Sequence, residues 1–265
     1  MIQVVQEIFE TSTIPVEWGI SNLVLISKVA HPKMIPQFQP ISLCNTLYKL
    51  VSCIIVQRLK PHITHLINPC QAEFVLGRRM SDNIILVQEI IHTMMNKTGC
   101  NGYVALKLDL DKAYDRLEWP FIRESLEFFQ VPPRLIMLIM SMVSLTQYHI
   151  QWNGILLPKL IPSKGVHQGD HLSLYLFILC LERFSILLED GVRAKTIHPI
   201  SFRGQVRISY LFFADDIFLF TKAKVRVCQN LNKILQKFCQ CSGQIISTHK
   251  SRIWFSPNTP HNIKA

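Results

Sequence analysis

The sequence predicts an α+β fold, and three observations support this prediction. Two short runs rich in aromatic and β-branched residues flank Asp215-Asp216, as expected of a hairpin with acids at its turn. A third apolar run, residues 104–108, ends in Asp109. Helical patterns lie between these strands and after them. The order β-α-β-β-α-β around the acids favours a ferredoxin-like, split βαβ arrangement.

The elements follow in order. Residues 22–28 predict a strand, and residues 43–66 predict a helix. Ser81 is placed to cap a helix over residues 82–95. The later predicted elements are two helices, a hairpin, a long helix, a basic helix and a strand: 119–129, 133–144, the strands flanking Asn153-Gly154, 172–189, 222–241 and 245–255.

Composition limits the class of protein. The chain has 265 residues, 49% of them hydrophobic and 17% charged, which is enough for a core and excludes a disordered tail. The net charge of +10 favours a polyanionic partner, and residues 201–265 hold ten basic and two acidic groups. The alternative for this basic cluster is a solvated helix face.

The sequence predicts an intracellular protein, cytoplasmic or nuclear. The N-terminus has no signal-peptide pattern, and the longest apolar stretch, 172–188, is interrupted by Glu182 and Arg183, so no membrane span is expected. The eight dispersed cysteines are expected to be free thiols. Cys239 and Cys241 with His249 lack the paired spacing of a zinc site.

The acids carry the predicted chemistry. An ionised carboxylate is not buried unpaired in apolar surroundings, so a cation is expected beside Asp215 and Asp216. If the strand that ends in Asp109 lies beside this hairpin, the three carboxylates are able to hold two Mg²⁺ ions about 3.5–4 Å apart, as in-line phosphoryl displacement requires. This predicts nucleotidyl transfer; the alternative is an ordinary polar hairpin turn.

Three segments carry a family resemblance: 109–116, 165–177 and 213–216. They resemble the A, B and C motifs of the reverse transcriptases of non-LTR (LINE-type) retrotransposons, especially the plant forms. Further matching segments cover about residues 14–258 in the family's order: 38–45 with Tyr48-Lys49, Arg58-Leu59-Lys60, 71–75 with Gly77-Arg78, Asp82-Asn83-Ile84, 242–244 and Lys250-Ser251.

This resemblance implies a right-hand polymerase. Fingers would occupy residues 1–100 and the palm 101–256, with fingers helices inserted at about 118–165 and a tail at 257–265. The implied activity is RNA-directed DNA polymerisation, which adds a dNTP to a DNA primer on an RNA template. The implied cofactor is a pair of Mg²⁺ ions, with Mn²⁺ as a substitute.

The resemblance also implies roles for residues. Asp109 and Asp215 would bind both metals and Asp216 would be the weaker ligand, so all three are expected to be catalytic. Asp111 and Asp115 are expected to be surface or helix-start groups.

Substrate-binding roles follow in the same way. Tyr114 would exclude a 2′-hydroxyl, unless it is a core aromatic. Gln168 and Gly169 would lie at the incoming nucleotide, unless they form an ordinary loop. Arg78 and Lys250 would contact phosphate, unless they are surface charges.

The chain departs from the family pattern at Gln39, where arginine is usual, and at His171 and Leu174, where prolines are usual. It also ends soon after the palm, which predicts a truncated chain without a thumb. The alternative function is therefore an inactive retrotransposon remnant that only binds nucleic acid. A nucleotide cyclase could use the same acidic hairpin, but the fingers motifs at 38–49 and 71–84 speak against it.

Overall fold

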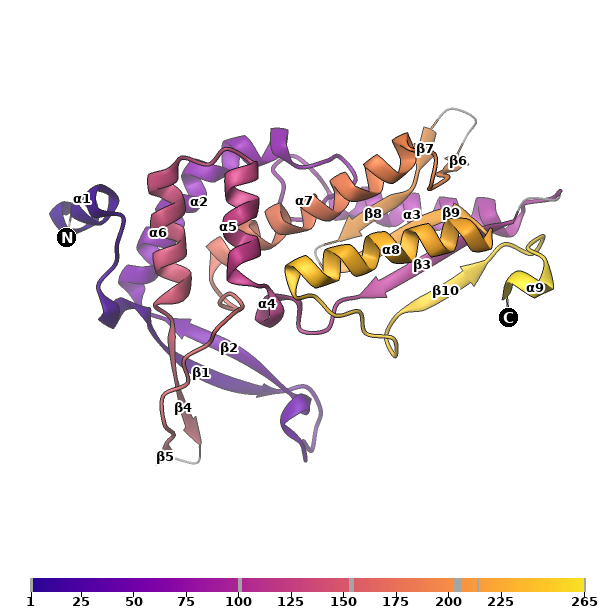
Figure 1. Ribbon diagram of the computed structural model, residues 1–265. Coiled ribbons are helices and arrows are strands. Elements are labelled where there is room, and N and C mark those ends of the chain that lie inside the picture. The colour runs from indigo at the N-terminus through magenta and orange to yellow at the C-terminus, as the bar shows by residue number, and fades with distance from the viewer. Residues whose placement is uncertain (1, 100–101, 153–154, 203–205, 214, 265) are drawn as a thin grey trace. The chain divides into compact units, whose positions relative to one another are not determined.

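The structure, a computed structural model, describes residues 2–99, 102–152, 155–202, 206–213 and 215–264. Helices and strands are mixed along the chain, which confirms the predicted α+β class (Figure 1). The chain divides into two compact units. Unit 1 comprises residues 1–62 and 114–179, and unit 2 comprises residues 63–113 and 180–265.

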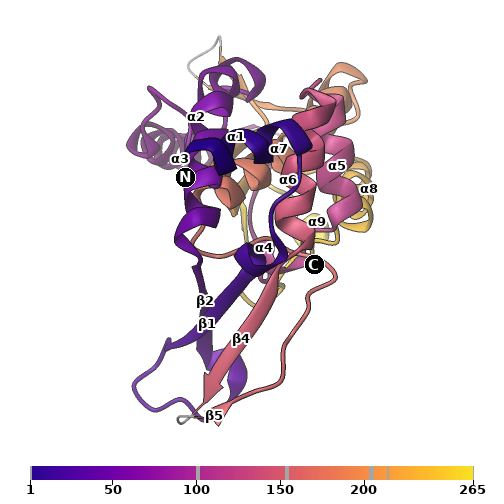
Figure 2. The ribbon, with the colours of Figure 1, turned by 90° about the vertical axis from the view of Figure 1, so that its left-hand side faces the viewer.

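Unit 1 contains a four-stranded sheet of order β2-β1-β4-β5. Strand β1 is antiparallel to β2 and parallel to β4, and Figure 2 shows β1 between them. The elements wholly or mainly in this unit are α1 (Ile2–Thr11), two 3₁₀ turns (Val16–Gly19 and Ile35–Gln37), β1 (Ile20–Ser27), β2 (Phe38–Cys44), α2 (Thr46–Leu66), α4 (Ala113–Arg116), α5 (Trp119–Phe128), α6 (Pro133–Ser144), β4 (Gln147–Trp152) and β5 (Ile155–Leu156).

Unit 2 contains a four-stranded antiparallel sheet of order β10-β3-β9-β8. Numbered among themselves in chain order, these strands read 4-1-3-2, the ferredoxin-like order that the sequence predicts. The elements wholly or mainly in this unit are α3 (Met80–Met95), β3 (Tyr103–Asp109), α7 (His171–Arg193), β6 (Ile200–Phe202), β7 (Val206–Ile208), β8 (Tyr210–Phe213), β9 (Asp216–Lys222), α8 (Val225–Ser242), β10 (Arg252–Phe255) and α9 (His261–Lys264).

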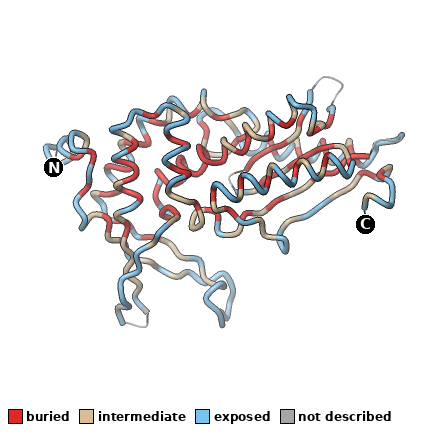
Figure 3. Tube along the Cα trace, viewed as in Figure 1, coloured by how far each residue is buried: buried red, intermediate tan, exposed pale blue. Residues whose placement is uncertain are grey.

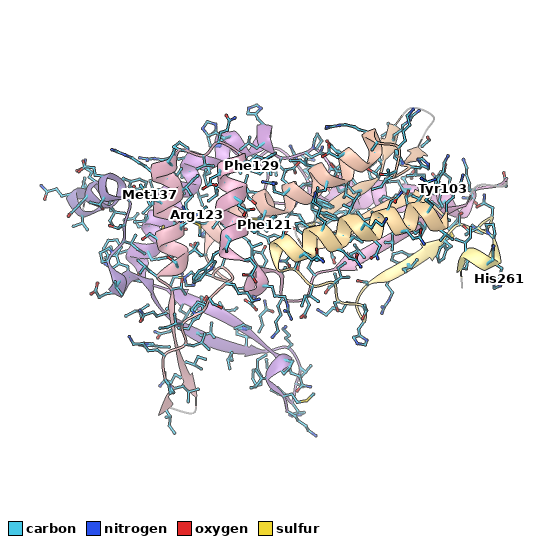
Figure 4. The ribbon with its side chains drawn as sticks, viewed as in Figure 1. Tyr103, Phe121, Arg123, Phe129, Met137 and His261 are labelled. Atoms are coloured by element: carbon cyan, nitrogen blue, oxygen red, sulfur yellow. The ribbon has the colours of Figure 1, made fainter. Side chains whose placement is uncertain are left out.

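The two faces of the unit 2 sheet have different coverings. We call the face that bears Asp109 and Asp216 the acid face. Helix α3 packs on that face, where its Ile90 and Met94 join a core with Tyr103, labelled in Figure 4, and four further residues of the sheet, Ala105, Leu211, Phe213 and Phe220.

The opposite face, here called the helix face, packs on α7 and α8. Phe212 of β8 stacks on Phe184 of α7, and Phe184 stacks on Phe238 of α8. Because neighbouring residues of a strand point to opposite faces, Phe212 and Phe213 contact different layers. Figure 1 accordingly draws α3 and α8 on opposite sides of β8 and β9.

Two sequence predictions about elements are wrong. Ser81 does not cap α3, because the helix already begins at Met80. The predicted strand 245–255 shrinks to β10, since the Ser251 N–H donates to the Ser247 carbonyl and closes a turn. Only Ile246 of the earlier part forms a bridge, to Leu110. The predicted turn at Asn153-Gly154 lies outside the described residues, although β4 and β5 flank it.

The predicted fingers range, 1–100, contributes to both units, since α3 packs in unit 2 with the sheet. Among the described residues one helix, α7, is long and apolar enough to cross a membrane. Most of this helix is buried within the protein, as in the core helix of a globular fold.

Candidate active site

Asp109 and Asp216 face each other across two neighbouring strands. Asp109 is the last residue of β3, Asp216 is the first residue of β9, and the two are direct partners in the antiparallel register. Directly opposed residues project from the same face with their Cβ atoms about 4.5–5.5 Å apart. The hairpin and the separate strand predicted from the sequence therefore do bring two of the three acids together.

Asp215 lies in the turn between β8 and β9, where Phe213 pairs with Asp216. Burial raises the pKa of the Asp215 carboxyl, the carboxylates of Asp216 and Asp109 raise it further, and Lys250 opposes them. Because like charges act on one another in this way only at short range, all three predicted acids share one electrostatic environment.

Two lysines balance the acids. Lys107 Nζ lies 2.9 Å from Asp216 Oδ2, and Lys250 Nζ lies 3.4 Å from Asp109 Oδ1. Lys107 precedes Asp109 by two residues on β3 and so shares the acid face. Lys250 is brought in because the Asp109 N–H donates to the hydroxyl of Ser251, at 3.2 Å. The cation that the sequence predicts beside the acids is present as these two side chains.

The donor set suits a hard cation, although it is not preassembled. Asp109 Oδ1 is buried and accepts no hydrogen bond. Carboxylate oxygens of this kind are the ligands that Mg²⁺ prefers. Among the described residues, however, no three His, Cys, Asp or Glu side chains are placed to hold a metal ion together.

A fourth acid, Glu73, lies near this group and was not predicted. The Phe212 N–H donates to the Cys70 carbonyl at 2.9 Å, and Gln71 forms a parallel bridge with Phe212. This pairing carries the chain alongside β8 toward the acidic turn. Burial raises the pKa of Glu73, and Asp215 and Asp216 raise it further. In the sequence Glu73 is simply an acid within the matched segment 71–75. Nothing in that segment indicates that the chain there pairs with β8.

Arg78 binds backbone carbonyls within the protein. Its guanidinium donates to the carbonyls of Thr64 and Ile67 at the end of α2 and to those of Asn68 and Gln71 in the following loop. These bonds use both terminal nitrogens and hold the loop that leads to Glu73. A contact between Arg78 and phosphate stays a prediction.

In unit 1, Tyr114, Gln168 and Gly169 form one connected group. The Val166 N–H donates to the Tyr114 carbonyl at 2.9 Å, and the Tyr114 ring packs against Phe177 with 4.8 Å between centroids. Tyr114 is only half-buried. Its assignment as the ribose-facing residue stays a prediction.

Gln168 is held at both ends. Its backbone carbonyl accepts from the Ser42 N–H at 2.9 Å, and its side-chain Nε2 donates to Asp115 Oδ1 at 3.0 Å. The sequence predicts a surface or helix-start role for Asp115, and in the structure its carboxylate also holds the side-chain amide of Gln168.

Gly169 adopts a φ of +108°, and a Cβ there would lie 3.2 Å from the Ser42 carbonyl oxygen. Glycine is therefore required both by conformation and by the close approach of β2.

His167, which directly precedes Gln168, is buried. Its Nε2 lies 2.8 Å from the Thr146 hydroxyl, and the rings of Tyr48 and Tyr148 meet it edge-on. Burial lowers the pKa of His167 to about 4, so the imidazole is neutral at physiological pH. Gln39, by contrast, is exposed on β2 opposite Ile26.

The sequence of this chain is similar to those of known proteins. Residues 30–264 match the family model described as reverse transcriptase (RNA-dependent DNA polymerase). The chain is 29% identical to the transposon TX1 uncharacterized 149 kDa protein of Xenopus laevis, over 97% of this chain and 19% of that protein. It is 26% identical to the retrovirus-related Pol polyprotein from the type-2 retrotransposable element R2DM of Drosophila melanogaster, over 89% of this chain and 21% of that protein.

A solved structure shows the same fold. The structure of telomerase from Candida tropicalis in complex with the TWJ fragment of telomeric RNA aligns with a TM-score of 0.62 at 14% identity, over 92% of this chain and 42% of that one. The chain spans about a fifth of the length of the two curated relatives, those of Xenopus laevis and Drosophila melanogaster. The resemblance found in the sequence motifs is confirmed, and the chain belongs to the reverse transcriptase (RNA-dependent DNA polymerase) family.

Proposed function

We propose that this chain is an RNA-directed DNA polymerase domain that transfers a nucleotide from a dNTP to the 3′-hydroxyl of a DNA primer on an RNA template. The observation that supports this most directly is the register of Asp109 opposite Asp216, with Asp215 in the adjoining turn. Carboxylates from two neighbouring strand ends on one face are the arrangement that two-metal phosphoryl transfer uses.

Asp109, Asp215 and Asp216 are the proposed catalytic residues and the ligands of two Mg²⁺ ions, or of Mn²⁺. When bound, the ions would lower the pKa of the primer hydroxyl and neutralise charge on the triphosphate. In the reaction the primer 3′-hydroxyl would lose its proton to water, its oxygen would bond to the α-phosphorus, and the bond from that phosphorus to the pyrophosphate oxygen would break. Lys107 and Lys250 would exchange their carboxylate partners for phosphate oxygens, which keeps the charge of the site balanced.

The unit 1 residues would select the nucleotide. Tyr114 would lie under the ribose and exclude a 2′-hydroxyl, and Gly169 would let the backbone approach the nucleotide. Gln168 would hydrogen-bond near the nucleotide through its side-chain amide oxygen, because its amide nitrogen already donates to Asp115. These roles come from the motif resemblance, and the contacts of Gln168 and Gly169 with β2 support them.

The assignment of fingers and palm subdomains is part of the same proposal. Fingers would comprise residues 1–100 and the inserted helices at about 118–165, and the palm would comprise 101–256, which includes the four-stranded antiparallel sheet. We place the protein in the cytoplasm or the nucleus. The free thiols of all seven described cysteines suit such a reducing compartment.

Primer extension tests the proposal. A labelled DNA primer on an RNA template is incubated with the purified chain and Mg²⁺ or Mn²⁺, beside Asp109→Asn and Asp215→Asn/Asp216→Asn. Asp82→Asn, an exposed acid on α3, is the matched control. Extension by the wild type and the control but not by the site variants supports the proposal. Binding of the primed RNA without extension would instead leave an inactive, nucleic-acid-binding remnant.

A further inference from the structure

The exposed side of α8 carries three cations and three amides. Arg226, Lys233 and Lys237 recur at helical spacing, and Gln229, Gln236 and Gln240 lie between and beside them on the same side. All six are exposed, and we call them the basic face of α8. The other side of the helix is buried in the core through Val227, Leu231, Leu235 and Phe238, as the alternating colours of Figure 3 show.

No acid accompanies these cations. Residues 217–265 contain eight basic residues and no acidic one. The end of α7 shows the contrast, since Arg193 there is ion-paired with Glu189 and Asp190. Exposed helix faces usually mix charges of both signs, and such pairs stabilise the helix. A helix face with positive charges alone has no such pairs, and it attracts a polyanion.

This face and the acids lie on opposite sides of the unit 2 sheet. Helix α8 packs on the helix face through Phe238 and Phe184, whereas Asp109 and Asp216 project from the acid face. The sequence shows only that ten basic groups gather in residues 201–265, the segment that also holds Asp215 and Asp216. The structure divides them: Lys250 lies at Asp109, and the cations of α8 lie behind the sheet. A contact on the basic face of α8 is therefore separate from a contact at the acids.

We infer that the basic face of α8 is a second nucleic-acid-binding surface, separate from the active site, and that its occupant is an RNA strand. The choice of RNA rests on the proposed function, in which the domain meets an RNA template and a DNA primer, and of these two polyanions the template alone carries 2′-hydroxyls. Glutamine amides donate and accept hydrogen bonds, so they can contact 2′-hydroxyls as well as phosphates.

The dimensions and packing of α8 fit a strand rather than a membrane. Arg226 and Lys237 are eleven residues apart, which is about 16 Å along a helix, or the axial length of about five phosphates of one strand. A helix that binds at a membrane surface needs a free apolar side. The apolar side of α8 is already buried against the sheet.

The test compares two triple variants of the full chain. Arg226→Gln/Lys233→Gln/Lys237→Gln removes the charge of the basic face. Arg123→Gln/Arg134→Gln/Lys195→Gln removes the same charge from exposed positions elsewhere, Arg123 being labelled on α5 in Figure 4. Binding of an unstructured single-stranded RNA is measured over a range of salt concentrations. Equal melting temperatures check that both variants fold.

If three phosphate contacts are lost, the slope of log K against log salt falls by about 2, and affinity at about 0.1 M salt falls roughly 10- to 100-fold. The control triple should bind within about twofold of the wild type. Unchanged affinity and slope in the α8 variant would overturn the inference. An equal loss on single-stranded DNA of the same sequence would overturn RNA as the occupant. Loss of binding to anionic phosphatidylserine vesicles, with RNA binding intact, would overturn a nucleic-acid surface altogether.

Primer extension on a short primed template, run in parallel, separates this inference from the proposed activity. No extension by the wild type, together with RNA binding that the α8 variant loses, refutes the polymerase activity and leaves the RNA surface standing. Extension by the wild type together with unaltered RNA binding by the variant refutes the RNA surface alone.

Discussion

The side-chain amide of Gln168 donates a hydrogen bond to the carboxylate of Asp115, with 3.0 Å between Nε2 and Oδ1. An ionised carboxylate only accepts hydrogen bonds, so the amide nitrogen must face Asp115 and its oxygen must face away. Asp115 therefore fixes the orientation of the Gln168 amide, and under the proposed function the amide oxygen is the end offered to a nucleotide.

This relationship predicts that Asp115→Ala raises the KM for dNTP in primer extension with a smaller effect on kcat. A charge-assisted bond is worth about 1.5–3 kcal/mol, or roughly a 10- to 100-fold change. Gln168→Ala should raise KM similarly, and the double variant should be no worse than Gln168→Ala alone, because both remove one contact. Asp82→Ala is the control. Additive effects of the two substitutions would show that Asp115 acts independently of Gln168.

Gly169→Ala is expected to destabilise the protein more than Gly77→Ala. Both glycines have positive φ, +108° and +79°. An added Cβ at residue 77 meets nothing within 4 Å, whereas at residue 169 it lies 3.2 Å from the Ser42 carbonyl oxygen. Gly77→Ala should cost about 1 kcal/mol of unfolding free energy and Gly169→Ala about 2–3 kcal/mol, measured by urea unfolding. Equal losses would mean that the contact with β2 relaxes without cost.

Lys107→Met should tighten the binding of Mn²⁺ in the absence of nucleic acid. Lys107 lies 2.9 Å from Asp216 Oδ2, and a cation there competes with a metal ion for the carboxylate. Both side chains are about a third exposed or more, so the pair is worth about 0.2–1 kcal/mol and the affinity should rise up to about fivefold. Titration followed by electron paramagnetic resonance of free Mn²⁺ measures it. Lys222→Met, at the far end of β9 on the same face, should leave the affinity unchanged.

Glu182 should make stability fall as pH rises. Burial raises its pKa from 4.5 to about 7, although the Asn68 N–H donates to its Oε2 at 3.1 Å. Between pH 4.5 and about pH 7 the carboxyl is protonated in the folded protein and ionised in the unfolded chain. The contribution of Glu182 to the free energy of unfolding is therefore highest below pH 4.5 and falls as the pH rises to about 7. Glu182→Gln should therefore be more stable than the wild type above pH 7, by up to about 3 kcal/mol.

Thermal unfolding of Glu182→Gln and the wild type at matched pH checks this. The comparison must be made at each pH, because His167 contributes with the opposite sign. Its pKa is lowered from 6.5 to about 4, so its contribution is lost as pH falls through that range. A difference between variant and wild type that does not change with pH would show that the pKa of Glu182 is the same in the folded and the unfolded protein.

The sequence predicted the features that depend on local pattern. Alternating and helical periodicities placed the acidic hairpin, the helix 133–144 and the basic helix close to where the structure has them. The strand order also followed, because the alternation of strands and helices around Asp109 and Asp215 leaves few topologies. What the sequence could not supply are partners far apart along the chain.

Glu73 illustrates this, since it approaches the acids only because Gln71 bridges to Phe212, more than a hundred residues away. The bond between Asp115 and Gln168 is of the same kind. The side of the sheet on which α8 packs could not be read from its own pattern either. An amphipathic helix shows which of its sides is buried, but not which face of which sheet buries it.

The pairing of Asp109 with Asp216 makes the length of β3 as important as its acids. In a strand, removal of one residue turns every following side chain to the opposite face. Loss of a single codon between Tyr103 and Asp109 would thus point the last carboxylate toward α7 and α8, while every acid of the motif remained in the sequence. Variants of this chain that retain all three aspartates can therefore differ in the arrangement of the acids through reading-frame-preserving deletions alone, and an inventory of motif residues would not distinguish them.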